Sequence, residues 1–299
     1  MSFHEAFLWT LLRSVAAAAL AVPLSVWLVR LVQQSTGHSR FWWMLFVLCP
    51  LVAPDLIVGY SYRSFELSLL HRPALNHSFY FILALMKFLP AAVVTRFCSP
   101  PDAMSKSALH CARLARENCN DWLPFRFMEL MAGLRAHLPV FGIVFLLTMQ
   151  EFELASLLQI PAWTVHLFDS QAGGLNTHSS LRLLVLPVVV QVAVLVPLLW
   201  WGGVNSRESA SRWRLTDASL SGTTWPGLVI ATVAAVLTWG LPMAVVSLSG
   251  ISGIGGVVRN EVLMQSTILD LVAAVAVAIP CAVLSLVLAR KLGRLLSDC

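Results

Sequence analysis

Three long runs without a charged side chain constrain this sequence more than any other feature. They cover residues 183–206, 218–258 and 271–289. Each run is long enough to cross the roughly 30 Å of hydrocarbon in a bilayer as an α-helix. The runs are continuous, unlike the short alternating segments of a membrane strand barrel. Because a backbone in lipid must satisfy its own hydrogen bonds, they predict a helical membrane protein.

The composition of the whole chain fits this class. Of the 299 residues, 58% are hydrophobic and 12% are charged, which is outside the usual range of soluble domains. We expect an all-α, polytopic membrane helix bundle with about seven transmembrane helices, at residues 8–30, 41–60, 78–97, 138–158, 181–203, 225–249 and 266–290. The first span has no basic flank on its N-terminal side, which argues against a cleaved signal peptide.

Basic residues predict the orientation. Most of the 20 lysines and arginines fall in segments that share one side of the membrane, whereas Arg13 and a few others fall on the opposite side. Under the positive-inside rule, the N-terminus is outside, and the loop 98–137 and the C-terminus are cytoplasmic. The net charge of +5 therefore requires no nucleic-acid partner.

An internal similarity suggests how the chain is organised. The segments "TLLRSVAAAALAVPLSV" (10–26) and "TILDLVAAVAVAIPCAV" (267–283) share a threonine and a proline at the same spacing. We interpret this as a duplication. The expected parts are a core unit, 1–203, which contains the loop 98–137; a cytoplasmic linker, 204–224; and an accessory helix with the start of a second, truncated unit, 225–299.

The stretch "SALHCARLARENCNDWLPFRF" (107–127) is a long polar insertion within the loop. Its small residues recur at spacings of three and four and would share one face of a helix. They are Ala108, Cys111, Ala112, Ala115 and Cys119. A face of this kind permits another surface to approach closely. Periodicity alone does not separate a protein-docking helix from one that lies at the lipid headgroups.

Four ionisable residues lie in or near expected spans: Asp55, Lys87, Glu151 and Glu153. A charge at the bilayer centre costs at least about 2.5 to 3.5 kcal/mol, so these side chains should face protein or a water-filled cavity. In one interpretation they line a translocation path or brace gating helices, together with the helix-interrupting Pro90. In the other, Lys87 snorkels or pairs with Asp55, and the glutamates mark the outer end of a span.

Several segments, in their order, resemble permease subunits of binding-protein-dependent ABC importers, most of all the iron(III) and thiamine type with fused permeases. They are "LCPLVAPDLIVGY" (48–60), "MKFLPAAVVTRF" (86–97), "HCARLARENCNDWLPFRFMELMAGLRAHLP" (110–139) and "QEFELASLLQIPAWTVHLF" (150–168). The loop departs from the family pattern at His110, where the family has Glu, and near Arg116, where it has Gly.

The resemblance implies a type I importer core whose loop couples the solute path to a separate ATPase. The coupling residues would be Cys111, Ala112, Arg113, Leu114, Arg116, Trp122 and Arg126. It also implies ABC ATPase subunits, an extracytoplasmic solute-binding protein, and a second permease chain or a second copy as partners in a bacterial inner membrane. The substrate would be iron(III) or a small organic solute.

Enzyme classes fit the sequence less well. The glycines of "SGISGIGG" (249–256) lack a following Gly-Lys-Ser/Thr, so any ATP is expected to be bound by a partner and not by this chain. The eight histidines and six cysteines show no HExxH and no metal-type spacing, so we expect neither a metal site nor a cofactor. An intramembrane enzyme is one alternative. A degenerate permease-like subunit with a regulatory or scaffolding role is another, because the loop is altered.

Overall fold

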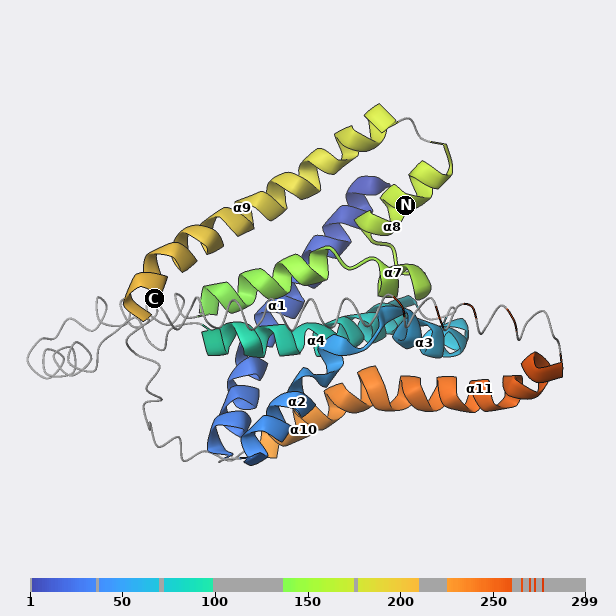
Figure 1. Cartoon of the computed structure of the whole chain (residues 1–299). Coiled ribbons are helices and arrows are strands. Elements are labelled where there is room, and N and C mark those ends of the chain that lie inside the picture. Colours follow the sequence, from blue (N-terminus) through green and yellow to red (C-terminus); the bar gives the residue numbers. More distant parts are fainter. Residues whose placement is uncertain are drawn as a thin grey trace, which may run out of the picture. The chain divides into compact units, whose positions relative to one another are not determined.

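The computed structural model describes residues 2–35, 38–69, 73–98, 137–174, 177–209 and 225–259, and the isolated positions 265, 269, 272 and 276 (Figure 1). Every regular element in these ranges is a helix, which confirms the all-helical prediction. The helices are α1 (Phe3–Gln34), α2 (His38–Val52), α3 (Asp55–Leu69), α4 (Pro73–Cys98), His137–Met149, α7 (Glu153–Leu157), α8 (Trp163–Ala172), α9 (Thr177–Ser209), α10 (Trp225–Ala235), the π-helix η1 (Val236–Gly240) and α11 (Leu241–Arg259).

Four helices in the described ranges are long and apolar enough to cross a membrane. They are Phe3–Gln34, Ala74–Phe97, His178–Leu199 and Trp225–Ile251. They coincide with the expected spans 8–30, 78–97, 181–203 and 225–249. Apart from isolated positions, the expected span 266–290 lies outside the described residues.

The expected span 41–60 is bent. The helices Ser39–Val52 and Asp55–Arg63 meet at 67°, so this part is a broken span or a re-entrant loop. The break falls at Ala53 and Pro54, where the proline ring disfavours the helical conformation of the residue before it. Counted as one crossing, the pair raises the number of candidate spans to five.

The expected continuous span 138–158 is wrong. The helix His137–Met149 ends before residue 150, and α7 begins only at Glu153 and is five residues long. The chain between them is not helical, because its polar groups bind other elements, as described below. Helix α9 continues to Ser209, into the first residues of the predicted linker 204–224.

By contacts, the chain divides into two compact units, Met1–Met243 and Ala244–Cys299. The first unit contains all the helices from α1 to η1. The functional division into residues 1–203, 204–224 and 225–299 stays a prediction.

Helix α4 is the central helix of the first unit. It contributes to both hydrophobic clusters, one shared with α1, the helix His137–Met149 and α10, the other with α3 and α7. Within the unit, 67% of the apolar part of α4 is buried, compared with 6% of that of α9. The exposed apolar surface of α9 suits contact with lipid.

Gly227 of α10 allows a close approach to α1. A Cβ atom built there would lie 2.7 Å from the carbonyl oxygen of Trp27 and 3.2 Å from Cβ of Leu31. A backbone carbonyl cannot rotate away, so Gly227→Ala should push the two helices apart and cost about 1–3 kcal/mol. The measurement is the thermal midpoint of the purified chain in detergent. Gly250→Ala, whose Cβ would meet no atom within 4 Å, is the matched control, and equal midpoints for the two variants would contradict the prediction.

Candidate functional site at the central helix

Three buried polar side chains follow one side of α4: Asn76, Tyr80 and Lys87. Their exposed fractions are 8%, 5% and 6%. Their spacing of four and seven residues places them on one helix face. We call them the α4 polar stripe. Each binds a segment that follows an interruption in a neighbouring helix, so the stripe connects α4 to the irregular parts of the fold.

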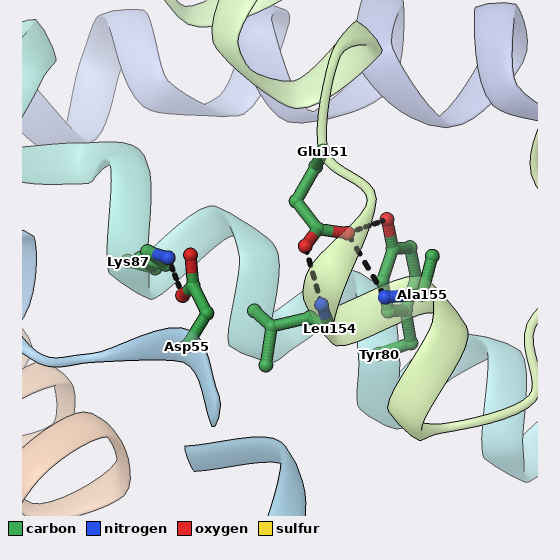
Figure 2. Close-up of polar contacts among 6 residues, drawn as sticks. All are labelled: Asp55, Tyr80, Lys87, Glu151, Leu154 and Ala155. Carbon is green, nitrogen blue, oxygen red and sulfur yellow. Dashed lines mark hydrogen bonds and ion pairs between the residues drawn. The ribbon is translucent and has the colours of Figure 1, made fainter. Parts of the chain in front are cut away.

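Lys87 forms an ion pair with Asp55 (Figure 2). The two side chains are 7% and 22% exposed. Asp55 is the first residue of α3, directly after the break at Pro54, and a carboxylate in the first turn also interacts favourably with the helix dipole. The ion pair therefore holds the bent pair α2–α3 to α4. Pairing of Lys87 with Asp55 was one of the two interpretations that the sequence left open.

Glu151 lies in the break that follows the helix His137–Met149, and its side chain is buried. Its Oε2 accepts hydrogen bonds from the hydroxyl of Tyr80 at 2.9 Å and from the backbone N–H of Ala155 at 3.0 Å, and its Oε1 accepts one from the N–H of Leu154 (Figure 2). Phe152, the residue before α7, has no side-chain cap of its own. Glu151 therefore caps α7 and joins it to α4.

Further hydrogen bonds hold the segment from Gln150 to Trp163. Nδ2 of Asn76 donates to the carbonyl oxygen of Leu158 at 3.3 Å. The backbone N–H of Trp163 donates to Oγ1 of Thr10 in α1 at 3.3 Å, and its indole N–H donates to the carbonyl oxygen of Met149 at 2.9 Å. The segment is thus attached at both ends and in the middle.

Arg13 contributes to the same region from α1. Its Nη2 donates to the carbonyl oxygen of Pro161, and its guanidinium lies over the ring of Tyr80, 5.2 Å from the centroid. This is the geometry of a cation–π contact. The positive-inside rule counted Arg13 among the basic residues of external segments. Instead, it lies within the candidate membrane helix Phe3–Gln34, where its charge is directed toward protein.

A third interruption, the π-helix η1, faces α3. The hydroxyl of Tyr62 donates to the carbonyl oxygen of Leu237 at 2.7 Å, and Oγ of Ser61 lies 3.2 Å from the carbonyl oxygen of Pro242. Single π-helical turns inside α-helices occur often at functional sites. Two hydroxyl groups of α3 therefore bind carbonyl groups in and just after an irregular turn.

The other candidate residues are placed as follows. Pro90 is buried in α4 one turn beyond Lys87, and the helix continues past it. Glu153 is exposed in the first turn of α7, so the two glutamates differ in environment. The proposed coupling residues, which lie outside the described residues, are Cys111, Ala112, Arg113, Leu114, Arg116, Trp122 and Arg126.

No family model, curated protein or solved structure matches this chain. Within the described ranges, no group of three or more His, Cys, Asp or Glu side chains is arranged to hold a metal ion. Lys87 and Asp55 pair with each other, and Glu151 accepts hydrogen bonds from Tyr80 and from a backbone N–H group. These contacts suit the three side chains to brace interrupted helices.

The two glutamates give a direct test of this geometry. In Glu151→Gln the amide NH₂ must replace one carboxylate oxygen, and each oxygen accepts from a backbone N–H. One donor would then face another donor, and the unsatisfied groups should cost about 1–3 kcal/mol. Glu153→Gln changes an exposed side chain, so its free energy of unfolding should stay within about 0.5 kcal/mol of that of the parent chain. Thermal midpoints in detergent measure both, and a Glu151→Gln midpoint equal to that of Glu153→Gln would show that Glu151 does not brace the segment.

Proposed function

We propose that this chain is the membrane-spanning permease subunit of a binding-protein-dependent ABC importer. The observation that carries the proposal is the gathering of interrupted helices around the α4 polar stripe. Transporters build sites and gates from discontinuous membrane helices, whose freed backbone groups bind neighbouring side chains. The bent pair α2–α3 and the break at Glu151 both have this form and both bind α4.

In this function α4 is the moving element that connects the cytoplasmic loop to the solute path. Helix α4 ends at Cys98, where the predicted loop 98–137 begins, and the helix that is described from His137 to Met149 follows the loop in the chain. A movement of the loop would therefore act directly on two helices that share a core. Asp55, Lys87 and Glu151 would brace the gating helices, and Pro90 would give α4 a flexible point.

The remaining parts of the proposal come from the resemblance. A solute-binding protein would deliver iron(III) or a small organic solute to the outer face, and separate ATPase subunits would bind and hydrolyse ATP in the cytoplasm. A second permease chain or a second copy would complete the path in the bacterial inner membrane. ATP binding can drive the change only if the partner interacts differently with the two states of the permease. A scaffolding role for a degenerate permease remains the second candidate, because His110 departs from the family pattern.

Co-purification tests the proposal. The tagged chain is extracted from its native membrane in mild detergent, and the proteins that elute with it are identified by mass spectrometry. We expect an ABC ATPase subunit in the sample and none with an unrelated membrane protein that carries the same tag. A monodisperse chain without any ATPase subunit would contradict the proposal and favour the scaffolding role.

A further inference from the structure

A small hollow, lined by apolar surface with a few polar groups, lies between α1, α4 and the helix His137–Met149. Its polar lining comes from Thr10, Arg13, Ser14, Tyr80 and Thr148, and its volume is about 10 Å³. A cavity needs roughly 10–15 Å³ to hold one water molecule. The hollow is therefore at the lower limit of the volume that one water molecule needs.

Arg13 lines the hollow and has an unused donor. Its Nε donates to the carbonyl oxygen of Trp9 at 3.0 Å, and its Nη2 donates to that of Pro161. Its Nη1 is buried and has no acceptor among the described residues. A buried guanidinium N–H without an acceptor is costly, particularly in a membrane helix, so an acceptor is expected there.

The hydroxyl groups that line the hollow offer hydrogen-bond acceptors. Thr10 and Thr148 each donate their proton to a backbone carbonyl oxygen at 2.8 Å, and Tyr80 donates its proton to Glu151 at 2.9 Å. A hydroxyl oxygen that has donated its proton still offers lone pairs as acceptors. The hollow thus combines the free N–H of Arg13 and the hydroxyl of Ser14, which can donate or accept, with acceptor lone pairs on Tyr80 and Thr148.

This combination selects the chemistry of the ligand. An anion only accepts, so it could use the donors of Arg13 and Ser14 but would face the lone pairs of Thr148 and Tyr80. A metal cation would meet the guanidinium of Arg13. A water molecule accepts and donates at the same oxygen, and it needs two to four polar partners.

We propose that the hollow binds one water molecule that accepts a hydrogen bond from Nη1 of Arg13 and donates to the hydroxyl oxygens of Thr148 and Tyr80. The water joins α1, α4 and the helix His137–Met149 next to the break at Glu151. It also solvates a guanidinium within a membrane-spanning helix. The inference stands whether or not the chain is a permease, because it depends only on the local donors and acceptors.

Radiolytic labelling in detergent tests the proposal. Short X-ray exposure converts water into hydroxyl radicals that modify the nearest side chains, and mass spectrometry gives the rate for each residue. Tyr80 and Tyr62 are matched, because both are buried tyrosines whose hydroxyl donates a hydrogen bond, and their exposed fractions are 5% and 9%. Radicals from bulk water would label Tyr62 faster, because Tyr62 is the more exposed of the two. We expect Tyr80 to react several-fold faster, and equal or slower labelling of Tyr80 would overturn the proposal.

A filling variant locates the source of the label. Ala84 lines the hollow, so Ala84→Val adds two methyl groups to the lining and reduces the space for a water molecule. We expect the rate at Tyr80 to fall to that at Tyr62, which should not change. An unchanged rate at Tyr80 would overturn the proposal. If the rate at Tyr62 rises, the variant has disturbed the fold, and Thr148→Val, which keeps the shape and removes one acceptor, takes its place with the same two outcomes.

Discussion

Replacing Lys87 with Met is expected to lower the stability of the fold by about 3 kcal/mol or more, because it leaves the carboxylate of Asp55 without its counter-charge. The reciprocal change, Asp55→Asn, should cost at least as much. It leaves the ammonium of Lys87 alone, and that side chain is 7% exposed compared with 22% for Asp55. The measurement is the temperature at which half of the purified chain remains monodisperse in detergent.

The double variant Lys87→Met with Asp55→Asn completes the test. It removes both charges, and replacing a whole buried pair by neutral side chains is often close to neutral. We therefore expect the double variant to be more stable than either single variant. A loss equal to the sum of the two single losses would show that the side chains do not interact.

The second large effect is expected on assembly. Ala112→Glu places a charge on the small-residue face that the sequence predicts for the stretch 107–127. If this face docks on an ATPase, the ATPase subunit should disappear from the purified sample, while the chain still inserts into the membrane. The loss should be complete, since an unpaired carboxylate would be buried in the contact.

His110→Glu is the matched control for Ala112→Glu. It adds the same side chain on the opposite side of the expected helix, at the position where the resembled family has Glu. We expect the ATPase subunit to be retained. Retention in both variants would mean that the small-residue face is not the docking surface, and loss in both would mean that any added charge disrupts the loop.

The membrane helices could be predicted from the sequence because hydropathy is summed over about 20 residues. The ends and breaks of helices depend on single residues and were less visible. The break at Pro54 carried a local signal in the proline itself. The break at Glu151 carried no such local signal, because its carboxylate stabilises a non-helical segment through Tyr80, which lies far away in the sequence.

Only those parts of the candidate site that carry a local signal in the sequence could be predicted. The cost of isolated charges in a membrane made pairing of Asp55 with Lys87 one of the alternatives, and the structure shows this pair. Arg13 was missed because it was assigned to an external segment, although a lone arginine in an apolar run is itself a signal. Asn76 and Tyr80 could have been found by their helical spacing from Lys87. Their partners could not be read from the sequence, because the carboxylate of Glu151 and the carbonyl oxygen of Leu158 meet α4 only through the tertiary fold.

Native mass spectrometry of the assembly released from mild detergent tests the proposed function most directly, because it counts the subunits. We predict an assembly that contains this chain, two ATPase subunits, and either a second permease chain or a second copy of this chain. The chain alone, or bound only to itself, would contradict the assignment as the permease subunit of an ABC importer.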